Sequence, residues 1–391
     1  MAEEITRCLF GLCLSLILYS YVGYPLAIYV AARRRRASST KASVKQSGEA
    51  RRRWPYVSLI IAAHNEEQVI QRRIRNALQL DYPRDRLEIL VVSDGSTDRT
   101  QEIVAAHASR GVRLLDLPQR RGKLYALTQA VAVARGEVLV LSDASTEFDE
   151  LAVRQLARHF REPDVGVVCG RLILHDPATG NNVDSAYWKY ETWIKRNEAR
   201  LGALIGASGA IYAIRRRMFI APPPHLVIDD FVIPVLARLN FQCRTAYEEQ
   251  AIARQSTPAN LRSEFARRAR IGAGGFQSIR VLWRLLHPRH GWAATAYLSH
   301  KILRWLCPFF LLGLILANAA LLSEPMFRWL WWLQCAFYLL AAAGLFLRGQ
   351  WQGMRVIRLT TMFSMMNLAL LLGFWRWIFG IQKGVWQRTV R

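Results

Sequence analysis

The stretch Val138-Leu139-Val140-Leu141-Ser142-Asp143-Ala144-Ser145 decides how the rest of the chain is interpreted. Its four apolar residues carry no charge and end in an acid followed by small residues, which indicates a buried β-strand. Ligands of open α/β sheets bind at the carboxyl edge of the strands, so Asp143 is a candidate site residue. The alternative is that Asp143 caps a helix, because Asp-Ala-Ser-Thr is also typical of a helix start.

Segments with the same apolar pattern precede this stretch and alternate with helical segments. Strands are predicted at residues 57–63, 88–92, 112–115 and 138–142. Apolar residues at helical spacing predict helices at residues 66–80, 98–107 and 122–134. The alternation predicts an α/β fold with a parallel, doubly wound sheet and right-handed crossovers.

The alternation is looser beyond Ser145. Strands are predicted at 165–168 and 171–174, an aromatic-rich helix at 183–201, and a glycine-rich segment of small residues follows at 205–213. Residues 261–286 mix arginines with apolar residues, which indicates an amphipathic helix lying along a membrane surface.

Apolar segments long enough to cross a bilayer lie on both sides of this central region. Residues 8–30 form the first, and Arg33–Arg36 follow it where a signal peptide has a small-residue cleavage site, so a retained anchor is expected. Three further candidates are 302–322, 329–347 and 359–380, rimmed by Trp and Arg. Arg304 and Arg376 lie near segment ends, where their side chains can reach the interface.

The charge is strongly positive, with 53 Lys and Arg against 29 Asp and Glu, or +24 in 391 residues. Many of these cations cluster at the predicted membrane edges, which favours contact with anionic lipid over nucleic acid. Arg33–Arg36 predict a cytoplasmic central domain and an inner-membrane, multi-pass protein. Four crossings would leave Arg388 and Arg391 outside, which the same rule disfavours, so one late segment in the interface is the alternative. The six cysteines are scattered and indicate neither a zinc site nor a disulfide framework, and they suit a reducing compartment.

The expected domains follow from these segments. They are an anchor (1–32), a basic linker (33–53), an α/β domain (54–260), interface helices (261–300) and a transmembrane bundle (301–391).

Acidic residues follow the predicted strands where a ligand is expected. Asp94 follows the second strand, Asp143 follows the fourth, and Asp229 and Asp230 form a pair further on. A nucleotide-linked donor carries a diphosphate, which a carboxylate would repel. A hard divalent cation between the two removes the repulsion, so Mg²⁺ or Mn²⁺ is the expected cofactor at Asp143. Lys123, at a predicted helix start, is suited to phosphate charge. Each of these residues has an ordinary alternative as a helix cap or a surface ion pair.

Four motifs now carry a resemblance. His64-Asn65-Glu66-Glu67, Ser93-Asp94-Gly95-Ser96-Thr97-Asp98, Arg121-Gly122-Lys123 and Asp143-Ala144-Ser145 occur in the order seen in family-2 glycosyltransferases of the GT-A fold, which the chain resembles. With Gly206-Ala207-Ser208-Gly209, Asp229-Asp230, Arg267-Arg268-Ala269-Arg270 and the apolar flanks, it looks like the membrane-integrated branch that contains cellulose, hyaluronan and poly-N-acetylglucosamine synthases.

The resemblance implies roles for individual residues. Contacts to the nucleotide sugar fall on Ala63, Asn65, Glu66, Asp94, Lys123, Arg267 and Arg270. Metal binding falls on Asp143 and Ser145, and the acceptor-lining turn is Gly206, Ala207, Ser208 and Gly209. Asp230 matches the general base that deprotonates the acceptor hydroxyl, with Asp229 beside it.

Two departures from the family pattern bear on these roles. Ser145 stands where the second acid of Asp-x-Asp is found, so metal binding rests on Asp143 and phosphate oxygens, with His175 as a speculative further ligand. Arg270-Ile271 stands where processive synthases have Arg-Trp, and Ile271 cannot stack on a sugar as an indole does.

The sequence therefore predicts an inverting glycosyltransferase that moves sugar from a nucleotide-diphosphate donor, expected to be UDP-linked, to a polysaccharide at the inner membrane. Expected partners are this donor, a polysaccharide or glycolipid acceptor, membrane lipid and export proteins, and no nucleic acid. One alternative is a non-processive enzyme with a lipid-linked acceptor. The alternative from another class is a non-catalytic scaffold or sugar-binding subunit of a polysaccharide secretion complex.

Overall fold

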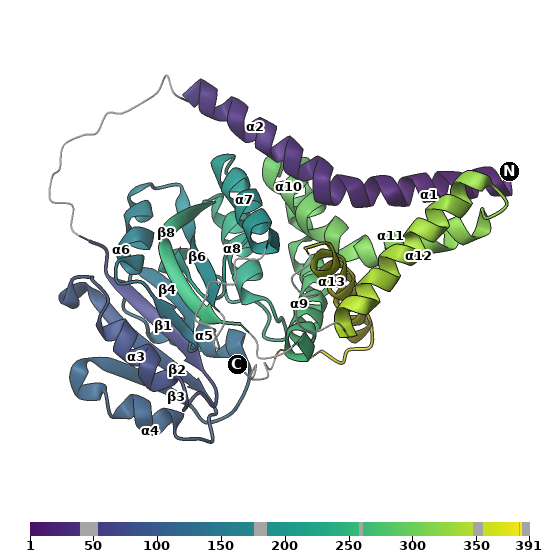
Figure 1. The fold of residues 1–391 in the computed structure, drawn as a ribbon. Coiled ribbons are helices and arrows are strands. Elements are labelled where there is room, and N and C mark those ends of the chain that lie inside the picture. The colour runs from purple at the N-terminus through teal and green to yellow at the C-terminus, as the bar shows by residue number, and fades with distance from the viewer. Residues whose placement is uncertain (40–53, 176–185, 258–260, 347–354, 383, 385–391) are drawn as a thin grey trace. The chain divides into compact units, whose positions relative to one another are not determined.

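A computed structural model describes residues 1–39, 54–175, 186–257, 261–346, 355–382 and 384. The chain divides into two compact units (Figure 1). The globular unit comprises Ile28–Ala259, Ser278–Ala296 and Lys383–Arg391, and the helical unit comprises Met1–Ala27, Asn260–Gln277 and Tyr297–Gln382.

The globular unit is built on an 8-stranded sheet of order β3-β2-β1-β4-β7-β6-β8-β5. The strands are β1 (Val57–Ala63), β2 (Leu87–Asp94), β3 (Val112–Leu117), β4 (Val138–Asp143), β5 (Thr146–Phe148), β6 (Val165–His175), β7 (Tyr212–Arg215) and β8 (Arg244–Ser256). Strands β1 to β4 are parallel to one another, as predicted.

The second half of the sheet, for which the sequence predicted no strand direction, is mixed. Strand β7 is antiparallel to both β4 and β6, and β5 is antiparallel to β8. The segments predicted at 165–168 and 171–174 are one strand, β6, with an irregular register between Gly170 and Arg171. Strands β5, β7 and β8 were not predicted from the sequence.

Helices cover the sheet. They are α3 (Ile70–Leu78), α4 (Thr100–Ala105), α5 (Lys123–Val133), α6 (Ala152–Arg158), α7 (Ala186–Arg200) and α8 (Asp229–Phe241), with α2 (Tyr24–Ser39) before the sheet and α10 (Trp292–Ala296) after it. Alternate residues of β1, such as Leu59 and Ile61, belong to one buried cluster with Ile74 of α3, Val104 of α4 and Leu156 of α6. Because side chains alternate along a strand, Ser58 and Ile60 face the other side of the sheet.

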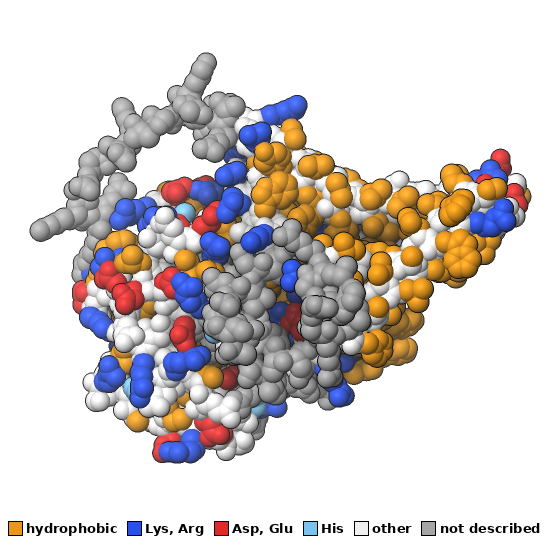
Figure 2. Space-filling view, viewed as in Figure 1, with side chains coloured by type: hydrophobic (Ala, Val, Ile, Leu, Met, Phe, Trp, Pro, Cys, Tyr) orange, Lys and Arg blue, Asp and Glu red, His pale blue; other side chains and the backbone are white. Residues whose placement is uncertain are grey.

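The helical unit contains α1 (Ala2–Leu18), α9 (Leu261–Leu282), α11 (Leu303–Ala320), α12 (Pro325–Phe346) and α13 (Arg355–Ile378). Within the described residues, four helical segments are long and apolar enough to cross a membrane: Ala2–Arg35, Trp292–Ala320, Pro325–Phe346 and Val356–Ile378. Their outer faces expose large apolar side chains, such as Trp329 at 77% and Phe346 at 82%, and these gather along α1 and α12 in Figure 2. Such surface is expected on segments that contact lipid.

Close packing in the helical unit differs from the sequence expectation at two places. A Cβ atom at Gly373 of α13 would lie 2.6 Å from the carbonyl oxygen of Ala269, so one face of α9 is covered by α13. Arg304 is buried rather than at the interface, and its side chain lies 3.5 Å from the carbonyl oxygen of Ser20 and 5.1 Å from the ring centre of Tyr21. The six cysteines all lie in described segments, and none of them forms a disulfide bond there.

Candidate active site

The predicted acids meet at the carboxyl edge of the parallel strands. Asp94 ends β2 and Asp143 ends β4, while Asp229 and Asp230 form the first turn of α8. Strand β4 lies next to β1 on one side and β7 on the other, so Asp143 sits where the sheet changes from parallel to antiparallel. This is the kind of position at which α/β sheets bind ligands.

Lys123 connects two of these acids. Its Nζ lies 2.8 Å from Asp143 Oδ1 and 3.1 Å from Asp229 Oδ2, and the three side chains are 19%, 33% and 7% exposed. Burial lowers the pKa of Lys123, but the carboxylates of Asp143 and Asp229 outweigh burial and hold this pKa above its usual value. The ammonium is therefore charged. It pairs with one acid at the end of a strand, Asp143, and one at the start of a helix, Asp229.

Asp229 is the most enclosed acid of the group. Burial raises its pKa to about 6, with Asp230 and Asp143 adding to the shift and Lys123 opposing it. Its Oδ2 has the ion pair with Lys123 but no hydrogen-bond partner among the described residues. The position of Asp229 thus depends on the cation of Lys123.

Asp230 lies against the predicted acceptor turn. Its Oδ2 accepts a hydrogen bond from the backbone N–H of Gly209 (2.9 Å), and its carbonyl oxygen accepts one from Ala207 (2.8 Å). A Cβ at Gly209 would lie 3.3 Å from the same carboxylate oxygen. The structure therefore brings the Gly206–Gly209 turn and Asp230 together, and both are half-buried.

Asp94 has a different position from the one expected of a residue that contacts the donor directly. It is fully buried, and its two carboxylate oxygens each accept a backbone hydrogen bond of 2.8 Å, from Arg121 and Gly122. Gly122 has a φ of 99°, which favours glycine. Asp94 thereby fixes the turn that begins α5 and positions Lys123, while a contact with the nucleotide remains a prediction.

The loop after β1 is bonded to the loop after β2. Asn65 adopts a left-handed conformation (φ 54°), and its Oδ1 accepts the backbone N–H of Thr97 at 2.8 Å. The backbone N–H of Glu66 donates to Thr100 Oγ1 at 2.8 Å, and Ala63 is buried at the end of β1. The predicted donor contacts Ala63, Asn65 and Glu66 therefore share one braced edge with Asp94.

The two predicted metal ligands differ in what they offer. Asp143 is half-buried, whereas Ser145 Oγ accepts a hydrogen bond from Gln255 Nε2 at 3.0 Å. Among the described residues, no group of three His, Cys, Asp or Glu could hold a metal. His175 pairs with Ser256 Oγ (3.1 Å). One accessible carboxylate fits Mg²⁺ or Mn²⁺ that takes its other ligands from water and phosphate oxygens, as Mg²⁺ commonly does.

Arg267 and Arg270 lie on α9, in the segment that belongs to the helical unit. Arg267 is paired with Glu264, with Nε 3.0 Å from Oε2. Ile271, in the position of the absent indole, is 39% exposed. The predicted contacts of both arginines with the donor remain predictions.

Two buried side chains near the acids were missed by sequence reasoning. Tyr212 on β7 is fully buried, its hydroxyl has no hydrogen-bond partner among the described residues, and burial together with Asp229, Asp230 and Asp143 raises its pKa well above the usual value. Arg73 of α3 is buried over the ring of Phe148 (4.5 Å), and burial lowers its pKa to about 9. Tyr212 lies in an apolar strand and Arg73 lies between other arginines of α3, so neither stood out in the sequence.

The mixed sheet, with acids at the edge where its parallel half meets the antiparallel strand β7, is the arrangement of the GT-A fold. A solved structure agrees with this fold: the mannosyltransferase PcManGT from Pyrobaculum calidifontis, in complex with GDP-Man and Mn²⁺, has a TM-score of 0.68 over 95% of this chain and 99% of that chain, at 20% identity.

Sequence comparisons narrow the class to a family. Residues 58–221 match the family model described as glycosyl transferase family 2. This match covers 164 of the 391 residues, all of them in the globular unit, whose fold is that of GT-A glycosyltransferases.

Named relatives match over part of their length. The poly-β-1,6-N-acetyl-D-glucosamine synthase of Staphylococcus epidermidis is 25% identical over 236 residues, which are 58% of this chain and 56% of that protein. A probable glycosyltransferase of Bacillus subtilis, YdaM, is 36% identical over 123 residues, 30% of this chain and 29% of that protein. The chain spans about half the length, 56%, of the curated synthase that it matches.

Proposed function

We propose that this protein is an inverting glycosyltransferase that moves a sugar from a UDP-linked donor to a growing polysaccharide at the inner membrane, with its globular unit in the cytoplasm. The observation that carries the proposal is the cluster of Lys123 with Asp143 and Asp229, next to Asp230 on its glycine turn. The cluster combines an accessible carboxylate, a buried cation and an oriented base at one edge.

The donor would bind with its diphosphate at Asp143 and Lys123. Asp143 and Ser145 are the residues that would hold Mg²⁺ or Mn²⁺, and the bound cation would neutralise charge on the leaving diphosphate. Lys123 supplies a fixed positive charge there, since Asp94 anchors the turn before it and two carboxylates keep it protonated. Ala63, Asn65, Glu66 and Asp94 would form the nucleoside side of the site, and Arg267 and Arg270 would contact the diphosphate.

Asp230 would act as the general base on the acceptor hydroxyl. The N–H of Gly209 orients one carboxylate oxygen, and the half-buried side chain leaves room for a hydroxyl to approach. The deprotonated hydroxyl attacks the anomeric carbon as the bond to the diphosphate breaks, so a single displacement inverts the configuration. Asp229 would hold the ammonium of Lys123 in place while the sugar is transferred.

The acceptor is proposed to be a polysaccharide because the synthase relatives carry that activity in their names and four helices are apolar enough to span a membrane. N-Acetylglucosamine is the first sugar to test for the same reason. A lipid-linked acceptor that receives single sugars is the second candidate. The observation that favours it is Ile271, which is 39% exposed in the position of a sugar-stacking indole.

Radiolabelled donors offered to the purified full-length protein in detergent test these proposals. UDP-N-acetylglucosamine, other UDP-sugars and GDP-mannose are each supplied with Mg²⁺ or Mn²⁺, and the products are sized. Long labelled chains support the synthase, and single additions to lipid support the second candidate. Absence of transfer from every UDP-sugar would contradict the proposed donor.

A further inference from the structure

A second pocket lies at the opposite edge of the sheet, where the parallel strands begin. It has a volume of about 940 Å³ and includes Pro55 before β1, Val138 at the start of β4 and Arg215 at the end of β7. Val138 pairs with Arg215, and Asp143 is at the far end of β4, roughly 17 Å away at the usual rise per strand residue. This pocket, here called the arginine pocket, is separate from the acid cluster.

Arginines dominate the lining. Six of them, Arg86, Arg135, Arg161, Arg215, Arg216 and Arg217, line the pocket. Among the described residues, Glu137 is the one acid that lines it with them. Arginines are six of the 13 lining residues, whereas Lys and Arg together are 53 of the 391 residues of the chain. A pocket lined so densely by positive charge attracts anions.

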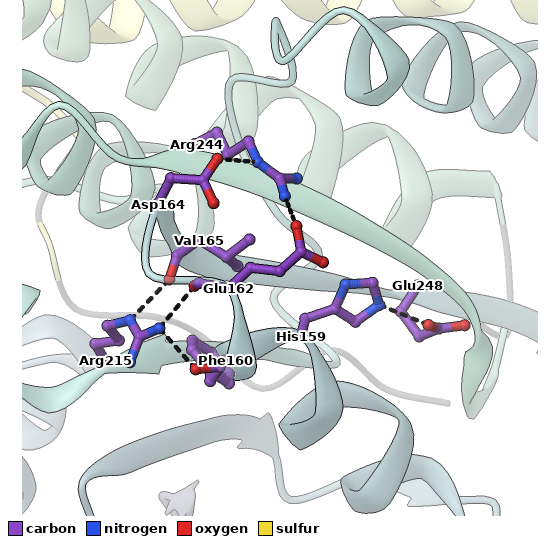
Figure 3. Close-up of polar contacts among 8 residues, drawn as sticks. All are labelled: His159, Phe160, Glu162, Asp164, Val165, Arg215, Arg244 and Glu248. Atoms are coloured by element: carbon purple, nitrogen blue, oxygen red, sulfur yellow. Dashed lines mark hydrogen bonds and ion pairs between the residues drawn. The ribbon is translucent and has the colours of Figure 1, made fainter. Parts of the chain in front are cut away.

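Arg215 is held in place by neutral groups (Figure 3). Its Nε donates to the carbonyl oxygen of Val165 (2.8 Å), and its Nη2 donates to those of Phe160 (2.8 Å) and Glu162 (2.9 Å). Backbone carbonyls orient the guanidinium without cancelling its charge. Burial lowers the pKa of Arg215, and the nearby cation of Arg217 lowers it further.

Of the other arginines, Arg86 has an acid beside it, with its Nε 3.4 Å from Asp85 Oδ2, and the rest have little negative charge nearby. Arg216 and Arg217 are exposed, and in the described part of the chain neither side chain has an ion pair. Arg161 lies over the ring of Trp54 (5.3 Å from its centre), an uncharged partner. Arg135 is 3.9 Å from Glu88 and 68% exposed.

The segments that carry these arginines are tied to the sheet by hydrogen bonds of the backbone. The N–H of Arg135 donates to the buried Glu88 Oε2 (2.9 Å), and that of Gly136 donates to Ser58 Oγ (2.8 Å). The N–H of Arg216 donates to the carbonyl oxygen of Glu137 at 2.9 Å, which ties the two arginine-bearing segments together. The backbone that carries these arginines is therefore fixed, and the guanidinium of Arg215 is itself held, which lowers the entropic cost of binding a ligand.

We propose that the arginine pocket binds an anion that carries two or more neighbouring phosphate groups. Guanidinium groups pair with phosphate oxygens through two parallel hydrogen bonds, and several converging guanidiniums suit several phosphates better than one carboxylate. The volume of about 940 Å³ lies within the range of clefts that bind small-molecule ligands. The proposal does not depend on the donor or the acceptor of the transfer reaction.

Binding of radiolabelled tripolyphosphate to the full-length protein in neutral-lipid nanodiscs tests the proposal. The test variant is Arg216→Ala/Arg217→Ala, and the matched control is Arg72→Ala/Arg110→Ala, which removes two exposed arginines outside the pocket. The proposal predicts binding by wild type and control, and at least tenfold weaker binding by the test variant. Absence of binding to wild type, or equal binding by all three, would overturn it.

Two further arms separate the sites and the sources of phosphate. Lys123→Ala reports binding at the donor site: if it abolishes tripolyphosphate binding while the arginine variant does not, the proposal is wrong. Cardiolipin, a lipid with two phosphates, is added to the nanodiscs in the second arm. Competition with tripolyphosphate that requires Arg216 and Arg217 identifies a lipid headgroup as the source, and absence of competition, with tripolyphosphate still bound, identifies a soluble anion.

Discussion

Replacing Lys123 by methionine removes the cation between Asp143 and Asp229 while keeping a chain of similar length. The side chain of Asp229 is 7% exposed, and its Oδ2 has Lys123 as its ionic partner and no hydrogen bond among the described residues. Lys123→Met therefore leaves a buried carboxylate without compensation. The side chain of Asp143 is 33% exposed, so water compensates most of the ion pair that Asp143 loses with Lys123.

The magnitude follows from these exposures. Removing one partner of a buried ion pair costs about 3–5 kcal/mol, and the lower end applies here because Lys123 is itself partly exposed. In a domain of this size, about 3 kcal/mol corresponds to a fall in Tm of roughly 10 °C. The double variant Lys123→Met/Asp229→Asn removes the stranded charge, and it should recover more than half of that loss.

The sign of the pH dependence is also fixed. Folded Asp229 has a pKa of about 6, above the ordinary value, so the folded state binds more protons and stability falls as pH rises towards 6. Without Lys123 the folded pKa of Asp229 is higher still, so the deficit of Lys123→Met relative to wild type grows above pH 6 and is small at pH 5.

Thermal unfolding of the detergent-solubilised protein, followed by tryptophan fluorescence at pH 5 and pH 8, measures these differences. Lys195→Met, a half-buried lysine of α7, is the control and should change Tm by no more than about 2 °C, as most substitutions away from buried networks do. The reasoning is refuted if Lys123→Met matches this control at pH 8, or if adding Asp229→Asn lowers Tm further.

Three more predictions follow from the same contacts. Asp143→Ala should abolish metal-dependent donor binding, whereas Ser145→Asp should preserve or tighten it; the opposite pattern in a titration with Mn²⁺ and UDP would remove both from the metal site. Tyr212→Phe deletes a buried hydroxyl that has no partner in the described residues, so Tm should stay level or rise, and a fall of more than about 3 °C, near 1 kcal/mol, would reveal a bond that the hydroxyl makes. Glu248 is buried beside Arg158 and His159, and although burial opposes the shift, hydrogen bonds from these two side chains hold its pKa below the usual value. Its stabilising contribution is therefore present above its unfolded pKa and lost as pH falls through the lower folded pKa, so Glu248→Gln should lower Tm at pH 7 and approach wild type in acid; a constant deficit would contradict this.

The parallel half of the sheet, strands β1 to β4, could be predicted from local sequence patterns. Strands β1, β2 and β4 are buried along nearly their whole length, so their sequences are apolar runs that stop where the strand stops. Strand β8 gave no such signal because it contains Glu248, a buried acid whose partners come from α6 and the turn after it. The pairing of β4 with β7 is antiparallel and joins distant segments, and no local pattern records it.

The candidate site was predictable as a set of residues but not as a set of contacts. Asp143, Asp229 and Lys123 were each singled out, yet their ion pairs depend on where α5 and α8 begin against the sheet. The donor contact of Asp94 stays a prediction, and the hydrogen bonds that its oxygens accept from the backbone N–H groups of Arg121 and Gly122 leave no trace in a sequence. Tyr212 reads as an ordinary strand residue, because only the fold places it beside three acids.

The rate of sugar transfer by the Asp230→Asn variant tests most directly the central claim, that Asp230 is the general base. The wild-type protein, Asp230→Asn and the matched exchange Asp164→Asn on the far edge of the domain are compared with one labelled UDP-sugar, measuring donor binding and product in the same preparation. The account predicts that Asp230→Asn binds donor as wild type does and forms product at least about a hundredfold more slowly, while Asp164→Asn is unaffected. Product formation by Asp230→Asn at the wild-type rate would contradict it.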